Sequence, residues 1–240
     1  MTKWDKKAKN YSRYSEEKDR FEQLIFNGLD SLKVDFQNSS LLDIGCGTGL
    51  YTLHLAQKCS HIDGIDSSKE MLEVLKNDAK DLDLSNIDTY HVGWNEFKCK
   101  DKYDYALCTM SPAIRLSEDL EKMSSCAKTK IYLGWAGKRD TQIIEQLFEA
   151  HGSKYFAPNG AKKVKEWLNS QNMFYQILEF DEEKVRTREF DKAVENFEWH
   201  LDVRGLKADR KIIIDVLEKF RDKDNLVTER TINHFNLIVW

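Results

Sequence analysis

Short apolar runs alternate with amphipathic stretches along most of the chain. Runs typical of buried strands cover residues 41–44, 61–66, 87–92, 103–108 and 130–135. The stretches between them place apolar residues at three- and four-residue steps, as surface helices do. Parallel neighbouring strands need crossover connections, which are usually helices. The pattern therefore predicts an α/β fold with a doubly wound, mostly parallel sheet, whose ligands bind beyond the carboxyl ends of the strands.

The same pattern predicts elements on both sides of this core. Residues 4–36 are charged and have apolar side chains at helical spacing, which predicts an amphipathic helix that packs on the core. Further helices are expected over residues 116–127, 142–150, 161–169, 188–202 and 209–221, and further strands over 174–180 and 232–240.

A glycine turn follows the first strand. Gly45, Gly47 and Gly49 come directly after the apolar run that contains Asp43, and a helical pattern then resumes. Glycine lets a backbone approach a ligand closely. A dinucleotide fingerprint would place its third glycine at position 50, where this chain has Leu50. A plain glycine-rich turn, or a nicotinamide or flavin site, is the alternative interpretation.

The Asp-x-Gly-x-Gly-x-Gly pattern from Asp43 to Gly49 resembles motif I of the class I S-adenosylmethionine-dependent methyltransferases. The resemblance implies S-adenosyl-L-methionine as cofactor and a Rossmann-like, seven-stranded sheet. It implies that Gly45, Cys46, Gly47 and Gly49 contact the cofactor. In this interpretation Asp43 binds the ammonium group of the cofactor, directly or through water.

The second strand ends in an acid at the distance that a nucleoside ribose requires. Asp66 lies about 20 residues after the glycine turn and is expected to accept both ribose hydroxyls. The segment from Ser67 to Leu72 resembles the helix start of the same family, with Ser67 or Ser68 as helix cap. Met71 is then expected against the adenine, although a buried core methionine is an equally simple reading.

The ends of the third and fourth strands depart from the family pattern. Members usually have an acid after Gly93 that holds the adenine amine, whereas this chain has Trp94 followed by Asn95. An indole cannot accept that hydrogen bond, so Asn95 or a backbone carbonyl reads the adenine, or Trp94 stacks beside it. The loop with Thr109, Met110 and Ser111 is expected to border the reacting methyl group. Its Ser-Pro pair matches only half of a motif found in enzymes that methylate amino groups, so amino-group methylation is not inferred.

Substrate contacts are expected on three other segments. The segment Trp4 to Tyr11 resembles the lid of small-molecule methyltransferases, and Tyr11 is a candidate cover and base. Trp135 ends the fifth strand and Arg139 follows it, and they are candidates for a wall of the substrate site and for a carboxylate anchor. The family core closes with two strands, the last antiparallel. The helices between them form an insertion that is expected to cap the active site, with Trp199 as a substrate contact and His200 as a weak base candidate.

Composition narrows the list of partners. The 240 residues include 37 Lys and Arg against 41 Asp and Glu, a net charge of −4, so a nucleic-acid partner is not favoured. The five cysteines have no zinc-ligand spacing, and neither a metal site nor a disulfide framework is predicted. No apolar run reaches membrane-spanning length, which predicts a cytoplasmic protein without a membrane partner.

These observations predict one domain and one activity. The chain is expected to form a single methyltransferase domain with a lid over residues 1–38, a cofactor-binding core over 39–155 and a substrate-side part over 156–240. The expected function is direct in-line methyl transfer to a small-molecule acceptor. A non-catalytic cofactor-binding module, or an enzyme acting on a protein or nucleic acid, is the alternative.

Overall fold

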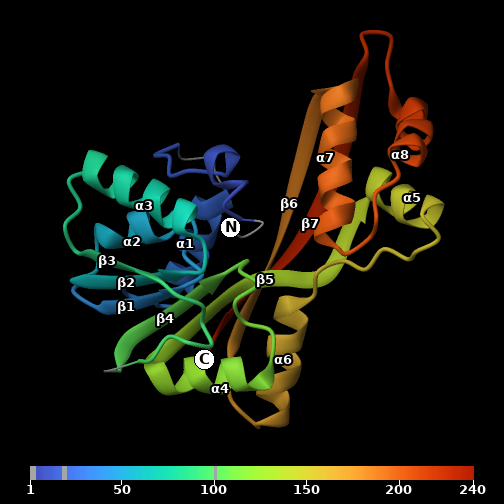
Figure 1. Cartoon of the computed structure of the whole chain (residues 1–240). Helices are drawn as coiled ribbons and strands as arrows, with labels where there is room; N and C mark the ends of the chain where they lie inside the picture. Colours follow the sequence, from blue (N-terminus) through green and yellow to red (C-terminus); the bar gives the residue numbers. More distant parts are fainter. Residues whose placement is uncertain (1–3, 18–20, 100–101) are drawn as a thin grey trace. The chain divides into compact units, whose positions relative to one another are not determined.

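A seven-stranded sheet forms the centre of the fold (Figure 1). The computed structural model describes residues 4–17, 21–99 and 102–240. The sheet has the order β3-β2-β1-β4-β5-β7-β6. Its strands are β1 (Ser40–Ile44), β2 (His61–Asp66), β3 (Ile87–His91), β4 (Tyr103–Thr109), β5 (Ala127–Thr141), β6 (Gln176–Glu189) and β7 (Leu226–Val239). The predicted doubly wound, mostly parallel α/β fold is confirmed.

The order of the strands reverses beside β1. β1 pairs in parallel with both β2 and β4, so that Asp43 lies between Gly64 and Leu107 in the register. β2 pairs with β3 and β4 with β5, both in parallel. Ligands of open α/β sheets bind at such a reversal, beyond the carboxyl ends of the strands.

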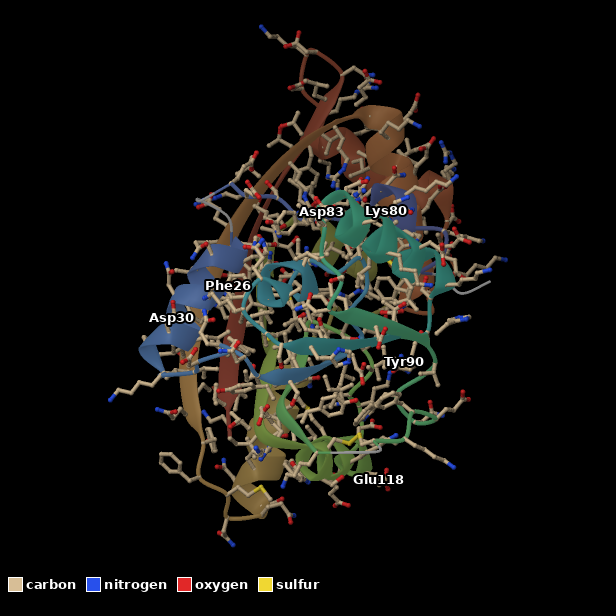
Figure 2. All side chains as sticks on the ribbon, turned by 90° about the vertical axis from the view of Figure 1, so that its left-hand side faces the viewer. Phe26, Asp30, Lys80, Asp83, Tyr90 and Glu118 are labelled. Carbon is tan, nitrogen blue, oxygen red and sulfur yellow. A yellow bond between two sulfur atoms is a disulfide. The ribbon has the colours of Figure 1, made fainter. Side chains whose placement is uncertain are left out.

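Helices alternate with these strands along most of the chain. They are α1 (Phe21–Ser31), α2 (Thr52–Ala56), α3 (Lys69–Asp81), α4 (Ser117–Cys126), α5 (Ile143–Ala150), α6 (Gly160–Ser170), α7 (Phe190–Val203) and α8 (Arg210–Leu217), with short 3₁₀ turns η1 (Ala8–Asn10) and η2 (Glu218–Phe220). Apolar residues of α1 and α2 pack in a cluster on one face of the sheet, and those of α4 and α6 pack in a cluster on the other. Figure 2 shows Phe26 and Asp30 on α1, and Lys80 and Asp83 at the end of α3.

The N-terminal region is less helical than its pattern predicts. Only α1 and the three-residue η1 are helical within residues 4–36, and part of the predicted helix, residues 18–20, lies outside the described residues. Residues 12–14 instead bind other elements: the Ser12 carbonyl accepts a hydrogen bond from Thr48 Oγ1, and Arg13 forms an ion pair with Asp78. These tertiary contacts outweigh the local helical preference.

The chain divides into two compact units. The first contains residues 1–136, 160–180 and 235–240, and the second contains 137–159 and 181–234. The second unit has a hydrophobic cluster of its own, built from residues of α5, α7 and α8 such as Phe197 and Ile213. α7 and α8 lie between β6 and β7 in the chain, as the predicted insertion requires. In the described part of the chain, no helix is long and apolar enough to span a membrane.

A disulfide joins Cys99 to Cys126, with the two Cα atoms 5.8 Å apart. The expectation that the cysteines form no disulfide was therefore wrong. It relied on sequence spacing, whereas the two cysteines are 27 residues apart and meet only because the chain between them runs through β4 and back along α4. The bond lies beside the helix that carries the labelled Glu118 in Figure 2.

Candidate active site

A cavity of about 600 Å³ lies within the first unit at the carboxyl ends of the parallel strands. This volume falls in the usual range for a small-molecule site. The cavity is lined by Trp4, Tyr11, Gly45, Cys46, Gly47, Thr48, Leu50, Tyr51, Ile65, Asp66, Ser67, Met71, Val92, Gly93, Trp94, Asn95, Thr109, Met110, Ser111, Pro112, Ala113, Arg115, Leu116 and Asp119.

The glycine turn forms the floor of this cavity. Gly45, Gly47 and Gly49 have φ angles of 73°, 56° and 82°, a region that side chains disfavour. A Cβ atom on Gly47 would meet nothing within 4 Å, so this glycine borders open space. A Cβ atom on Gly45 would lie 1.9 Å from Ser111 Oγ, so only glycine lets the turn and the loop after β4 approach so closely.

Asp43 lies beneath the turn and is 1% exposed. Its Oδ2 accepts a hydrogen bond from Thr52 Oγ1 at 2.6 Å, and its Oδ1 has no hydrogen-bond partner among the described residues. Burial raises the pKa of this carboxyl to about 7. An acid with an unused buried oxygen suits a cationic group held through water above it.

Asp66 connects the end of β2 to the glycine turn. Its two carboxylate oxygens accept hydrogen bonds from the backbone N–H groups of Gly47, at 3.0 Å, and Ser68, at 2.7 Å. Burial raises the pKa of Asp66, and these two hydrogen bonds oppose the shift. The carboxylate is thus fixed at the cavity wall, where each oxygen has a further lone pair for a ligand hydroxyl.

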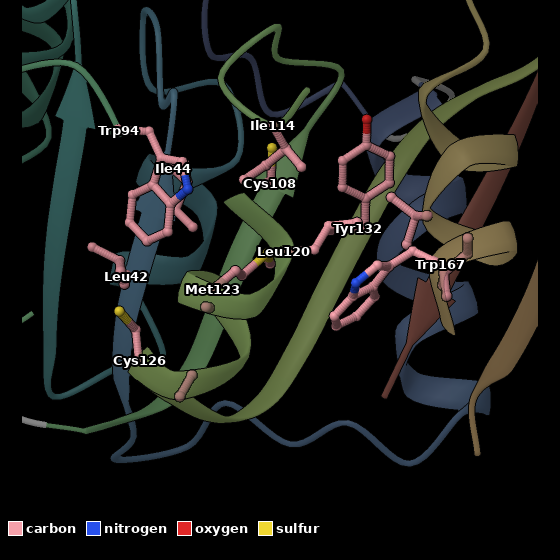
Figure 3. Close-up of a cluster of buried hydrophobic side chains, with 14 of the residues drawn as sticks. Leu42, Ile44, Trp94, Cys108, Ile114, Leu120, Met123, Cys126, Tyr132 and Trp167 are labelled. Atoms are coloured by element: carbon pink, nitrogen blue, oxygen red, sulfur yellow. The ribbon is translucent and has the colours of Figure 1, made fainter. Parts of the chain in front are cut away.

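The segment after β3 brings Gly93, Trp94 and Asn95 to the wall. Trp94 is only 4% exposed and packs beside Ile44 in a core cluster (Figure 3). Its indole Nε1 donates a hydrogen bond to the Asp119 carbonyl at 3.2 Å. The indole is therefore used for packing and for a contact with α4, and Asn95 carries the only side-chain acceptor of the three residues.

The loop after β4 borders the cavity beside the glycine turn. Met110 has a φ of 48°, and its N–H donates to the Leu133 carbonyl at 2.7 Å. Ser111 Oγ accepts a hydrogen bond from the Ala113 N–H at 3.2 Å. These bonds fix the backbone of the loop, and they place Thr109, Met110 and Ser111 in the lining as predicted.

The N-terminal segment covers part of the cavity. Trp4 and Tyr11 both line it, with an edge-to-face contact and ring centroids 6.2 Å apart. Ser68 Oγ donates to Asp5 Oδ1 at 2.6 Å, and Thr48 Oγ1 donates to the Ser12 carbonyl at 2.7 Å. Burial and the nearby Asp66 raise the pKa of the Tyr11 phenol, so at neutral pH it is a hydrogen-bond donor and a poor base.

Several predicted residues lie outside the lining. Asp43 and Gly49 lie beneath the turn, where a Cβ atom on Gly49 would collide with Leu75 of α3. Trp135 packs against Phe235, with ring centroids 4.6 Å apart. Arg139, Trp199 and His200 belong to the second unit, and their roles at the acceptor stay predictions.

The structure also adds residues that the sequence interpretation missed. Tyr51, Arg115, Leu116 and Asp119 line the cavity. The side chain of Asp119 accepts hydrogen bonds from the N–H groups of Arg115 and Leu116, both at 2.9 Å, and so fixes the start of α4. No capping-box signal is visible in the sequence here, because the residue before the helix is Leu116 and not a polar cap residue.

Comparisons with known proteins agree with this geometry. The family model described as a methyltransferase domain matches residues 41–129. A release factor glutamine methyltransferase from Buchnera aphidicola is 38% identical over 148 residues, which is 61% of this chain and 50% of that protein. The chain spans about half the length of the curated relatives that it matches in this way.

Solved structures share the fold at low sequence identity. A putative methyltransferase from Bacillus halodurans has a TM-score of 0.56 at 11% identity, over 89% of this chain and 96% of that one. A methyltransferase from Geobacter sulfurreducens, solved with S-adenosyl-L-homocysteine, has a TM-score of 0.52 at 12% identity, over 96% of both chains. The resemblance read from Asp43 to Gly49 is confirmed, because residues 41–129 match the methyltransferase domain family and the chain shares the fold of solved methyltransferases.

Proposed function

We propose that this protein transfers a methyl group from S-adenosyl-L-methionine to a compact small-molecule acceptor. The observation that carries the proposal is the cavity of about 600 Å³, in which the glycine turn, Asp66 and the N-terminal aromatic residues meet. The acceptor class goes beyond the family match and rests on the cover over this cavity.

The residues present fit the cofactor along the length of the cavity. Gly47 leaves open space for a ligand that lies flat on the turn. Asp43, with its unused buried oxygen, suits the ammonium group, and Asp66 suits the ribose hydroxyls. Asn95 and the backbone at Gly93 are left to bind the adenine amine. These assignments follow the family order of strands and are proposals for this chain.

The cover favours a small acceptor. The N-terminal segment is held over the cavity by hydrogen bonds from Ser68 to Asp5 and from Thr48 to the Ser12 carbonyl. A protein or nucleic acid would need this face open, whereas a compact molecule can be enclosed there. The net charge of −4 also disfavours a nucleic acid.

The chemistry requires positioning more than proton transfer. The sulfonium of the bound cofactor supplies an electrophilic methyl group with a good leaving group. The protein must hold the acceptor in line with that group and exclude water, and orientation of this kind contributes about 7–11 kcal/mol in favourable cases. Tyr11 can donate a hydrogen bond at the cavity, and Met110 and Ser111 line the same cavity, where they would border the reacting atoms.

Two measurements test the proposal. Titration calorimetry should show binding of S-adenosyl-L-methionine and S-adenosyl-L-homocysteine, with NAD binding more weakly than either. A screen with radiolabelled cofactor against small amines, phenols, thiols and carboxylic acids should then yield a methylated product. Tighter binding of NAD would refute the cofactor assignment. Transfer only to protein or nucleic acid would refute the acceptor class, and cofactor binding without transfer to any acceptor would leave a binding module.

A further inference from the structure

The Cys99–Cys126 disulfide joins two elements that each carry residues lining the cavity. Cys99 ends the segment after β3, whose residues Gly93, Trp94 and Asn95 line one wall. Cys126 is the last residue of α4, and Asp119 near the start of the same helix also lines the cavity. The bond therefore ties together two elements that the site uses.

Three hydrogen bonds and a cation–π contact join the same elements. The Trp94 indole donates to the Asp119 carbonyl, and Lys122 Nζ donates to the carbonyls of Trp94 and Asn95. The Lys122 ammonium group also lies 4.3 Å from the centre of the Trp94 ring. Asp119, Lys122 and Cys126 follow one another at steps of three and four residues, so they share one face of α4. The disulfide is the covalent end of this row of contacts.

The segment from Val92 to Cys99 has other attachments as well, because the Val92 N–H donates to the Asp66 carbonyl at 3.0 Å and the Trp94 ring is buried in a core cluster. It leads from Cys99 into residues 100–101, which lie outside the described residues, and then into β4. Phe97 packs on Trp94 with ring centroids 6.3 Å apart, and on Tyr90 at 5.8 Å. Without the disulfide, the Cys99 end of the segment would depend on the packing of Phe97 and on the three hydrogen bonds with α4, while Val92 stays bonded to Asp66.

We propose that Cys99 and Cys126 form a reversible thiol–disulfide site that sets how well the cavity binds the adenosine part of the cofactor. The proposal rests on the proposed cofactor site. The disulfide holds Gly93, Trp94 and Asn95 in place before binding, whereas the reduced segment must be ordered during binding, which lowers affinity. A coupling of this kind changes affinity by about 5- to 150-fold, and a tenfold loss on reduction is expected.

Reduction of the disulfide requires a dithiol reductant, which attacks the sulfur of Cys99. Cys126 is buried, whereas Cys99 is partly exposed. A thiolate of the reductant attacks Cys99 Sγ, the bond between the two protein sulfurs breaks, and Cys126 leaves as a thiolate that takes up a proton. The second thiol of the reductant then displaces Cys99. The products are two protein thiols and one disulfide of the reductant, and an oxidised dithiol restores the protein disulfide by the reverse steps.

The experiment compares the two redox states of the full chain. Denatured wild-type protein should release three titratable thiols before dithiothreitol treatment and five afterwards, because Cys46, Cys59 and Cys108 are free. The dissociation constant of S-adenosyl-L-homocysteine should rise about tenfold on reduction. 5′-Methylthioadenosine, which lacks the amino-acid part, should show the same loss.

Two variants separate the switch from a general effect. Cys99→Ser should bind weakly with or without dithiothreitol. Cys59→Ser changes a buried cysteine outside the cavity lining and should respond to dithiothreitol as the wild type does. Circular dichroism of the reduced wild type must show a folded chain, so the comparison holds even if Cys99→Ser does not fold.

The outcomes distinguish this inference from the proposed function. Equal affinity in the two redox states, or a loss seen with S-adenosyl-L-homocysteine but not with 5′-methylthioadenosine, overturns the switch and leaves the proposed function standing. Five thiols before reduction overturn the disulfide itself. Failure of both redox states to bind either nucleoside counts against the proposed cofactor site.

Discussion

Two acids at neighbouring strand ends differ in their surroundings and so in their expected roles. Asp66 lines the cavity and accepts two backbone hydrogen bonds, which favour its ionised form. Asp43 is buried beneath the turn with a single hydrogen bond from Thr52, and burial raises its pKa to about 7. Asp66 is therefore suited to a direct hydrogen bond with a ligand, and Asp43 to a longer-range interaction with a positive charge.

Replacing Asp66 by alanine should weaken cofactor binding. The change removes charge-assisted hydrogen bonds worth about 1.5–3 kcal/mol, so the dissociation constant of S-adenosyl-L-homocysteine should rise by about one to two decades. Titration calorimetry measures this change, and thermal unfolding should show that the variant stays folded. Asp88→Ala, at an exposed position of β3, is the matched control. An unchanged constant in Asp66→Ala would place the ribose elsewhere.

The pKa of Asp43 predicts a pH dependence of cofactor binding. A bound cation favours the ionised carboxylate, so below pH 7 binding must release a proton. Affinity should rise toward about pH 7 and then level off, changing by at most about tenfold per pH unit. In the cofactor-free protein, the free energy of unfolding changes with pH in the opposite direction. The stability that the protonated Asp43 contributes is lost as pH rises through about 7.

Calorimetry in buffers of different ionisation enthalpy measures the proton release. In Asp43→Asn the pH dependence should disappear, while Thr52 can still donate its hydrogen bond to the amide oxygen. A wild-type affinity that stays constant from about pH 5.5 to about pH 8, a range that brackets the pKa of Asp43, would show that the ionisation of Asp43 is not linked to cofactor binding.

At the scale of elements, the N-terminal segment and α3 depend on each other. Ser68 caps α3 by accepting a hydrogen bond from the Met71 N–H, and the same hydroxyl donates to Asp5. One side chain thus stabilises the helix start and holds the cover over the cavity. Sequence reasoning gave Ser67 or Ser68 as the cap, and the structure identifies Ser68.

Asp5→Ala should loosen the cover without unfolding the core. Charge-assisted hydrogen bonds are worth about 1.5–3 kcal/mol, and this partly exposed one lies at the lower end of that range. The dissociation rate of S-adenosyl-L-homocysteine should therefore rise by about tenfold. Stopped-flow displacement measures this rate. Lys6→Ala, an exposed neighbour in the same segment, should leave it unchanged. Equal rates in both variants would show that the segment does not retain the ligand.

The sequence predicted elements better than their ends or their long-range contacts. The strands around Asp43 and Asp66 were found because apolar runs and glycines are local signals. The predicted helix over 4–36 was too long, since the contacts of Ser12 and Arg13 with other elements are not visible in periodicity. The Cys99–Cys126 bond was missed for the same reason, because it needs the path of the chain through β4.

The candidate site shows the same limit. The glycine turn and the residues at strand ends were predicted because the family motif fixes their spacing. Tyr51 and Arg115 were not, since only the fold shows which side of a helix start borders the cavity. Trp135 was expected at the carboxyl end of a strand over 130–135, whereas β5 continues to Thr141, and Trp135 lies inside this strand and packs on Phe235.

At the scale of the whole molecule, the hydrophobic core is divided. The clusters on the two faces of β1 belong to the first unit, and the cluster of α5, α7 and α8 belongs to the second. All described residues that line the cavity are in the first unit. Stability of the second cluster and affinity for the cofactor should therefore be separable.

Phe197→Ala tests this separation. Phe197 is 1% exposed in the cluster of the second unit, and its truncation should cost about 3–5 kcal/mol of unfolding free energy. Scanning calorimetry should show unfolding at a lower temperature. The dissociation constant of S-adenosyl-L-homocysteine for the folded variant should stay within about threefold of the wild-type value, which is less than the tenfold change that corresponds to about 1.4 kcal/mol. Val203→Ala, at the exposed end of α7, is the control. Loss of binding in the folded Phe197 variant would contradict the separation.

The substitution of an acid by Trp94 also bears on which purines the protein tolerates. A carboxylate can only accept a hydrogen bond, so it selects a 6-amino purine and repels a 6-oxo purine. The Asn95 amide lines the cavity instead, and rotation of its terminal group presents either an acceptor or a donor. The protein should therefore bind S-inosyl-L-homocysteine within about tenfold of the adenosyl compound, a difference of about 1.4 kcal/mol. Competition calorimetry would measure that ratio, and a discrimination far above it would mean that another group reads the base.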